Sequence, residues 1–269
     1  MDPTATWELM LACLHTGDRD GAHEAATNLY EWLGKGGFAP TIGTMRRVDF
    51  EQIARAVIQA CGVASKETAL DVDMTQYIVD LVERNPGQMT VDEYGEIADR
   101  IVRADGCKLL VFGCGKDSEL WAWANHKGET VFLEHSPKWA DSANRTILAS
   151  DRPHGDFRMV AVEYRTKLER WQQEITGDLF LFGLLDFPGE AWDIVVVDSP
   201  QGAGAGAPGR LQSIYEAGRL VKPDGWIYVH DMKRPLERAA TAHLLRGKGF
   251  KRVRVTENLS GFRRDDAEL

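Results

Sequence analysis

The strongest constraint on the fold is a continuous apolar run that leads into two glycines, KLLVFGCGKDS at residues 108–118. Apolar residues without alternation predict a strand buried on both faces, which is the pattern of a parallel sheet. Gly113 and Gly115 permit a sharp turn and close approach of a ligand, and Asp117 and Ser118 suit the start of a helix. The stretch predicts a strand, glycine loop and helix that bind a nucleotide or cofactor, although a tight connection alone would use the same residues.

The pattern of the chain changes after about residue 100, from helices to alternating strands and helices. Helical spacing of apolar residues covers 4–33, 49–61, 73–84 and 90–104. Strands are predicted at 109–112, 130–134, 157–162, 192–198, 226–230 and 252–256, with helices between them, one of which covers 166–175. We therefore predict an α/β fold in which a Rossmann-like, doubly wound parallel sheet with helices on both faces (88–269) follows an all-helical domain (1–87). The helical domain could be a lid, a dimerisation element or a packing domain.

Composition excludes several classes of partner. The net charge of −9 argues against nucleic acid and against an anionic membrane surface. The 4 cysteines form no C-x-x-C motif, so they indicate reduced thiols in a cytoplasmic protein, without a disulfide or zinc framework. Neither a signal peptide nor a membrane span is predicted. The expected partner is a small-molecule acceptor, and a homodimer is compatible with the sequence.

A carboxylate after the second predicted strand favours an adenosine-containing cofactor. Glu134 stands 21 residues after Gly113, the spacing at which an acidic residue grips a ribose diol. The glycine loop reads G-x-G-x-D and lacks the third glycine of pyrophosphate-binding loops. This favours S-adenosylmethionine over NAD(P). The predicted cofactor site also includes Cys114, Ser118 and His135, which neighbour these residues. A solvated glutamate at a strand end is the alternative.

Acidic and imidazole side chains follow the fourth and fifth predicted strands. Asp198 ends one strand and His230 and Asp231 end the next, so they gather at the sheet edge where open α/β sheets bind ligands. They are candidate catalytic residues that could act as a general base, hold a divalent cation, or simply bond to loop amides. Because His230 and Asp231 are consecutive, only one should face the substrate unless the strand ends between them. Asp198 is also assigned to the cofactor site.

Candidate substrate-binding residues lie on the connections beside this edge. Arg210 begins a predicted helix, where it could pair with Asp198 or grip a carboxylate. Tyr164 and Arg165 follow the third strand, where a charged surface turn is the simpler reading.

Taken together, these motifs resemble the glucuronoxylan 4-O-methyltransferase family of plants. The similar stretches are LVFGCGKDS (110–118), TVFLE (130–134), YRTK (164–167), WDIVVVD (192–198), APGR (207–210) with IYEAG (214–218), and VHD (229–231). The resemblance implies a Rossmann-like methyltransferase domain that binds S-adenosylmethionine at Gly113, Gly115, Asp117 and Glu134. It also implies a polar acceptor site around Asp198, Arg210, His230 and Asp231, and Tyr215 is added to the predicted substrate contacts.

The chain departs from the family at three positions. The family usually has a histidine at the position of Lys116, and an acidic residue at the positions of His135 and Lys233. We therefore predict a methyltransferase acting on a hydroxyl or amine of a small polar, in some cases anionic, acceptor. Transfer of the aminocarboxypropyl arm of the same cofactor and a non-catalytic cofactor-binding relative are the alternatives. A divalent metal is compatible with the sequence and not required by it.

Overall fold

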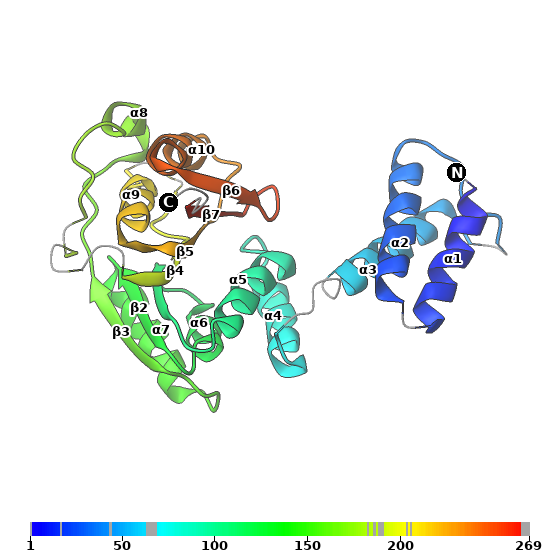
Figure 1. Cartoon of the computed structure of the whole chain (residues 1–269), viewed down its shortest axis with the longest axis horizontal. Helices are drawn as coiled ribbons and strands as arrows, with labels where there is room; N and C mark the ends of the chain where they lie inside the picture. The colour runs from blue at the N-terminus through cyan, green and yellow to red at the C-terminus, as the bar shows by residue number, and fades with distance from the viewer. Residues whose placement is uncertain are drawn as a thin grey trace. The chain divides into compact units, whose positions relative to one another are not determined.

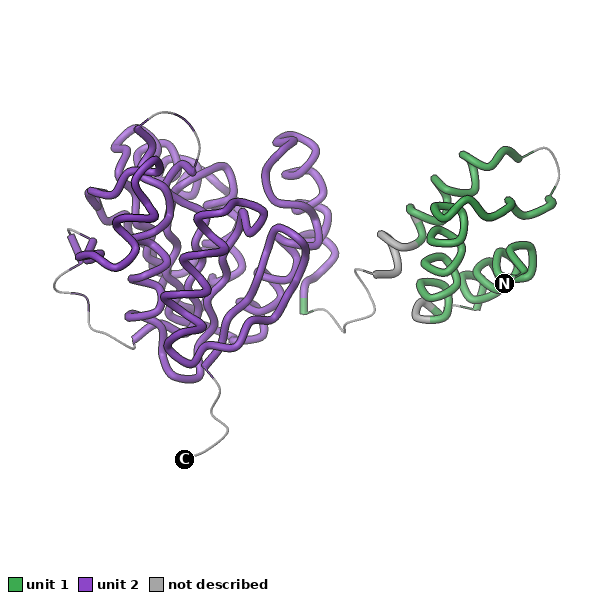
Figure 2. Tube along the Cα trace, turned by 90° about the horizontal axis from the view of Figure 1, so that it is seen from above, with its two compact units in different colours: residues 1–69 green, residues 70–269 purple. Residues whose placement is uncertain are grey.

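The structure is a computed structural model, which describes residues 2–264 apart from 17, 43–44, 63–68, 182, 185–186, 188–190, 203 and 205. The chain forms two compact units, residues 1–69 and 70–269 (Figure 2). Each has a hydrophobic core of its own. The division differs from the one expected at residues 87 and 88.

The first unit contains the helices α1 (Pro3–Thr16), α2 (Arg19–Gly34) and α3 (Arg47–Gly62). Asp18 caps α2 by accepting a hydrogen bond from the Gly21 amide at 3.0 Å, so the connection between α1 and α2 ends at this residue. The ring of Trp7 packs edge-on against that of Phe50 in the core, with 4.8 Å between centroids. The predicted helices of residues 4–33 and 49–61 are confirmed.

Helices α4 (Val72–Arg84) and α5 (Val91–Arg103) belong to the second unit. One face of α4 is apolar at helical spacing, and Tyr77, Ile78 and Leu81 on it are buried in the same core as strand β1 (Lys108–Phe112). This shared core places the boundary before α4, whereas the boundary predicted from the sequence lies between α4 and α5.

The second unit is built on a seven-stranded sheet in the order β3-β2-β1-β4-β5-β7-β6. The strands are β1 (Lys108–Phe112), β2 (Glu129–Glu134), β3 (Asp156–Ala161), β4 (Trp192–Val197), β5 (Val221–Val229), β6 (Phe250–Arg254) and β7 (Ser260–Arg264). The first five pair in parallel, and β7 runs antiparallel to both β5 and β6. The order reverses between β1 and β4, so a ligand crevice is expected beyond the ends of these two strands.

Helices cover both faces of this sheet (Figure 1). Helices α4, α5, α6 (Ser118–Ala124) and α7 (Pro137–Ala149) pack on one face, and α9 (Leu211–Leu220) and α10 (Pro235–Ala240) pack on the other. Alternate residues of β1 point into the two cores. Leu109 and Val111 pack under α4 to α7, and Leu110 and Phe112 pack under α9 and α10. The predicted fold, a class I methyltransferase sheet with an N-terminal helical domain, is confirmed.

Several predicted elements are wrong in detail. Residues 166–175 form only a 3₁₀ turn (Leu168–Arg170) and the short helix α8 (Trp171–Glu174). The last predicted strand is a hairpin of β6 and β7, so the sheet is not wholly parallel. After α10 the chain continues as a π-helical turn (Thr241–Leu245) and a 3₁₀ turn (Arg246–Lys248). Within the part of the chain that is described, no helix combines the length and apolar character needed to cross a membrane.

Candidate functional site

The glycine loop after β1 requires its first glycine for two reasons. Gly113 has a φ of 115°, which L side chains rarely adopt, and a Cβ on it would lie 2.4 Å from Cβ of Ser199. The loop is therefore pressed against the chain that leaves β4. The Gly115 amide donates to Ser118 Oγ at 3.0 Å, which fixes the loop at the start of α6.

Asp117 faces the cavity beside this loop instead of capping α6 with its side chain. Its carboxylate accepts a hydrogen bond from Trp121 Nε1 at 3.1 Å. Burial and the nearby charge of Asp198 raise the pKa of Asp117 to about 6. At neutral pH the group is ionised, which suits a cationic ligand.

Glu134 lies beside the glycine loop, as its spacing predicted, but it is almost wholly buried. Its Oε2 accepts from the Cys114 amide at 2.9 Å, and its Oε1 accepts from the Ser136 amide at 2.8 Å. His135 Nδ1 lies 2.9 Å from Oε1 of the same carboxylate. Glu134 does not line the cavity described below. It therefore holds the loop in shape, and a contact with ribose stays a prediction.

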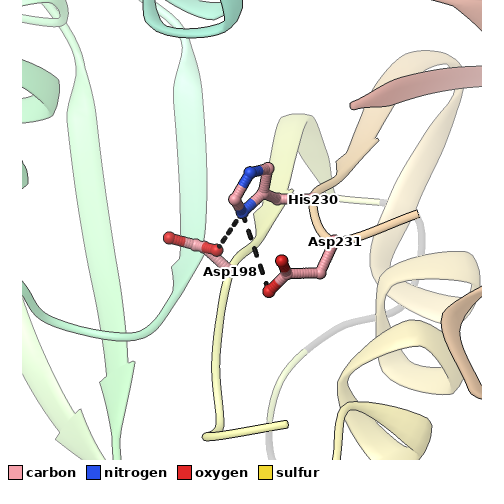
Figure 3. A group of neighbouring side chains, drawn as sticks. All are labelled: Asp198, His230 and Asp231. Atoms are coloured by element: carbon pink, nitrogen blue, oxygen red, sulfur yellow. Dashed lines mark hydrogen bonds and ion pairs between the residues drawn. The ribbon is translucent and has the colours of Figure 1, made fainter. Parts of the chain in front are cut away.

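Asp198, His230 and Asp231 meet at the ends of β4 and β5 (Figure 3). His230 Nδ1 lies 2.9 Å from Asp198 Oδ1 and 3.8 Å from Asp231 Oδ2. Strand β5 ends at Val229, and Asp231 has a φ of 63°, so the chain turns and brings both side chains to one side. Because the strand ends before these residues, the alternation expected of an extended strand does not apply to them.

Arg210 joins the two carboxylates of the cluster. Its Nη2 lies 3.0 Å from Asp198 Oδ1 and 2.7 Å from Asp231 Oδ2, and its Nη1 donates to the His230 carbonyl at 3.0 Å. The side chain is only 6% exposed. Of the two roles considered from the sequence, pairing with Asp198 is the one present. Because these contacts occupy the guanidinium, a direct substrate contact by Arg210 does not fit.

A divalent metal does not fit this arrangement either. The candidate ligand atoms of Asp198, His230 and Asp231 lie within 4.8 Å of one another. However, the Arg210 guanidinium already bridges the two carboxylates, and one of their oxygens also faces His230 Nδ1. A metal would have to displace Arg210 and leave its buried positive charge without a partner.

His230 is held on its other side by two residues that the sequence did not single out. Its Nε2 lies 2.9 Å from the amide nitrogen of Asn258 and 3.6 Å from Glu93 Oε2. Burial lowers the pKa of His230, but the hydrogen bonds with Asp198 and Glu93 outweigh burial and raise the pKa to about 9. The ring is therefore an imidazolium at neutral pH. A doubly protonated ring donates from Nε2 to Glu93, or to the oxygen of Asn258 after a half-turn of that amide.

Asp198 is ionised and anchored through one oxygen. Burial opposes its charge, yet the positive charges of Arg210 and His230 hold the pKa of Asp198 below its usual value. The contacts of its carboxylate with His230 and Arg210 both involve Oδ1. Asp198 also lines the cavity, so its second oxygen, Oδ2, is the one available to a ligand.

A cavity of about 570 Å³ lies between the glycine loop, the chain after β4 and the connection from α4 to α5. Its volume suits a cofactor of the size of S-adenosylmethionine. The lining residues are Arg84, Asn85, Pro86, Gln88, Tyr94, Val111, Phe112, Gly113, Cys114, Gly115, Lys116, Asp117, Trp139, Asp198, Ser199 and Gln201. Gly113, Cys114, Gly115, Asp117 and Asp198 of the predicted cofactor set are thus brought together. Ser118, Glu134 and His135 do not line the cavity: Ser118 and Glu134 accept hydrogen bonds from the glycine loop, and His135 contacts Glu134.

The predicted substrate residues are not gathered in one place. The Tyr164 hydroxyl accepts a hydrogen bond from Ser213 at 3.1 Å, and its ring packs against His135 near Glu134. The Arg165 amide donates to Gln212 Oε1 at 2.8 Å, while the side chain of Arg165 is exposed. Tyr215 packs against Phe180 and does not line the cavity. Tyr164 is the one of the three that lies near the cofactor-site residues.

Comparison with known proteins assigns the chain to a family. The family described as IRX15/IRX15L/GXM matches residues 92–178 and 182–262, and the chain belongs to this family. It is 30% identical to glucuronoxylan 4-O-methyltransferase 3 of Arabidopsis thaliana over 72% of this chain and 70% of that protein. It is 25% identical to arabinogalactan O-methyltransferase 2 of the same plant, over 73% of this chain and 77% of that protein. The Podospora anserina methyltransferase PaMTH1, solved with SAH, superposes with a TM-score of 0.45 at 14% identity, covering 84% of this chain and all of that one.

The family and its named members make this chain an S-adenosylmethionine-dependent methyltransferase. By their names, the two plant relatives act on polysaccharides. The small acceptor expected from the sequence has no support in these relatives.

Glu93, Asn258, Arg84 and Asn85 are site residues that sequence reasoning missed. Glu93 belongs to a capping box at the start of α5, where its Oε2 accepts a hydrogen bond from the Thr90 amide at 2.8 Å. Asn258 lies in the turn of a hairpin that was not predicted. No local signal in the sequence points to their position beside the site.

Proposed function

We propose that this enzyme methylates a hydroxyl oxygen of a carbohydrate acceptor carried on a glycan. The family assignment supports it, because both named relatives are O-methyltransferases of polysaccharides. The observation that carries the proposal is Asp198, an ionised carboxylate with one oxygen anchored and the other available in the cavity. S-adenosylmethionine supplies a methyl group on a positively charged sulfonium.

In this proposal Asp198 accepts the proton of the acceptor hydroxyl. A carboxylate is a weak base, but a hydroxyl becomes strongly acidic only as its oxygen forms the new bond to carbon, so a late proton transfer to a well-placed carboxylate suffices. His230 cannot take this proton near neutral pH, because its pKa is raised to about 9. His230 and Arg210 orient Asp198 and hold Oδ1, which makes them positioning residues.

The test is a methylation assay with deuterated-methyl S-adenosylmethionine. The acceptors are glucuronic-acid-bearing xylan oligosaccharides, arabinogalactan oligosaccharides, neutral xylan oligosaccharides and free sugars. We expect a methyl ether on an oligosaccharide, located by mass spectrometry and NMR. Asp198→Asn should lose at least about a hundredfold in turnover, because general-base catalysis typically contributes that much, while cofactor binding persists.

Asp224→Asn is the matched control, since Asp224 is an exposed carboxylate within the β5 segment. It should keep full activity. Methylation of an amine instead of a hydroxyl, or full turnover by Asp198→Asn, would contradict the proposal.

A further inference from the structure

The connection between α4 and α5 lines the cavity with polar groups to which no role has been given. Arg84, Asn85, Pro86 and Gln88 all contribute to the lining. The chain here is held firmly: the Asn85 amide donates to the Val82 carbonyl at 3.2 Å, and Met89 is buried in the core that α4 and α5 share with the sheet. A cavity wall built this way is set before any ligand binds.

Asn85 presents an acceptor that lacks a partner. Its side-chain nitrogen donates to the Leu81 carbonyl at 2.7 Å, which fixes the orientation of the amide. The residue is only 9% exposed, and within the described chain its Oδ1 is buried without a hydrogen bond. An orphaned buried oxygen of this kind costs free energy unless a ligand or water donates to it. The site therefore calls for a donor at Asn85 Oδ1.

Arg84 precedes Asn85 in the chain, lines the same cavity and carries a positive charge. Its Nε donates to the Asp80 carbonyl at 3.0 Å, and its guanidinium carbon lies 6.0 Å from the centre of the Tyr77 ring. Both contacts leave the two terminal nitrogens as a pair of donors, the geometry that binds a carboxylate in bidentate fashion. Lys116, on the glycine loop, is the other cation of the lining. It is exposed, as Arg84 is, but its ammonium is a point charge without the paired donors of a guanidinium.

We infer that the end of α4 holds the amino-acid arm of S-adenosylmethionine: Asn85 Oδ1 accepts from the α-ammonium group and Arg84 binds the α-carboxylate. In the ligand, the ammonium and carboxylate groups are attached to one carbon. In the protein, the acceptor of Asn85 and the cation of Arg84 lie on consecutive residues, so each ligand group has a counterpart. The carboxylate of Asp117 lines the same cavity and suits the sulfonium. The inference rests on the use of this cofactor, and it explains why α4 belongs to the second unit.

The test compares three ligands by calorimetric titration: S-adenosylhomocysteine, its decarboxylated analogue, and 5′-methylthioadenosine, which lacks both charged groups. Arg84→Gln should weaken S-adenosylhomocysteine about ten- to a hundredfold, the usual effect of losing a charge-assisted hydrogen bond. It should leave the other two ligands within about twofold. Asn85→Ala should weaken the first two ligands and spare 5′-methylthioadenosine, whose binding also shows that the variant is folded.

Arg145→Gln, which alters an exposed arginine of α7 that does not line the cavity, is the matched control and should leave all three affinities unchanged. Lys116→Gln removes the other cation of the lining and should not show the selective loss of S-adenosylhomocysteine. Equal loss of every ligand in Arg84→Gln, no loss at all, or the selective loss appearing in Lys116→Gln instead would overturn the inference. If the unaltered chain bound none of the three ligands, the cofactor assignment itself would fail and take this inference with it. If the unaltered chain bound S-adenosylhomocysteine and Arg84→Gln affected all three ligands equally, the inference would be wrong and the cofactor assignment would stand.

Discussion

Raising the pH from 6.5 to 9 should weaken the second unit through His230. The unfolded chain binds a proton at this side chain with a pKa of 6.5, and the folded chain with a pKa of about 9. Below 6.5 both states are protonated and the stabilising contribution is complete. Between these values the folded state binds more protons, so the contribution falls as the pH rises and is lost above about 9.

The magnitude follows from the difference between the two pKa values. Each unit is worth 1.36 kcal/mol, so a change from 6.5 to about 9 corresponds to about 3 kcal/mol. The group is well suited to this conversion because it is only 5% exposed. The physical source is the pair of flanking carboxylates, Asp198 on Nδ1 and Glu93 on Nε2.

The assay is urea unfolding followed by tryptophan fluorescence at a series of pH values, for the unaltered chain and for His230→Gln. Subtracting the two removes the titrating groups that do not interact with His230, including those of the first unit. The difference should shrink by about 3 kcal/mol between pH 6.5 and 9. Glu93→Gln, which keeps the histidine and removes one carboxylate, should give a smaller pH-dependent part. Parallel pH profiles for the unaltered chain and His230→Gln would refute the reasoning.

Three further predictions concern the cofactor cavity. Gly113→Ala should lower both cofactor affinity and melting temperature, because of the positive φ and the overlap with Ser199; adding Ser199→Gly should restore part of each, and no restoration would contradict the clash. Affinity for S-adenosylmethionine, measured by calorimetry, should fall as the pH drops through about 6, because Asp117 is then protonated and loses its attraction for the sulfonium. If Asp117→Asn lost affinity over the same pH range to the same extent, Asp117 would not be the group responsible. Deleting residues 1–69 should leave cofactor affinity within about twofold, since every lining residue lies between 84 and 201; a larger loss would show that the first unit is needed.

Local patterns were sufficient for most of the fold. The unbroken apolar run before Gly113 predicted a doubly buried strand, and the structure confirms it at residues 108–112. The same reasoning failed at residues 166–175, where helical spacing gave only two short turns. There the backbone is held by a side chain from another element, because Gln212 Oε1 accepts from the amides of Arg165 and Thr166 at 2.8 and 3.1 Å. Tertiary contacts of this kind override local propensity.

The candidate site divides along the same line. Residues that end a strand, such as Asp198 and His230, could be predicted because parallel strands deliver their carboxyl ends to one edge. Glu93 and Asn258 could not, because they reach His230 from a helix start and a hairpin turn that lie far away in the sequence. The predicted boundary between the two units differed from the observed one for a similar reason. Helix α4 packs on the sheet through buried contacts, and helical spacing alone does not reveal them.

The long-range contacts also decide the charge of the site, and hence which acceptors it tolerates. Three carboxylates and three cations are linked in one cluster: Asp198, Asp231 and Glu93 with His230, Arg210 and Arg234. Their formal charges cancel only while His230 stays protonated, which its raised pKa ensures up to about pH 9. Without Glu93, the ring would lose one of the two carboxylate hydrogen bonds that raise its pKa, and the cluster would lose one negative charge. Glu93 therefore favours the imidazolium beside Asp198, and its own charge is balanced by that imidazolium. These six groups then present no net charge to an anionic sugar, and the carboxylate that accepts its proton is already oriented.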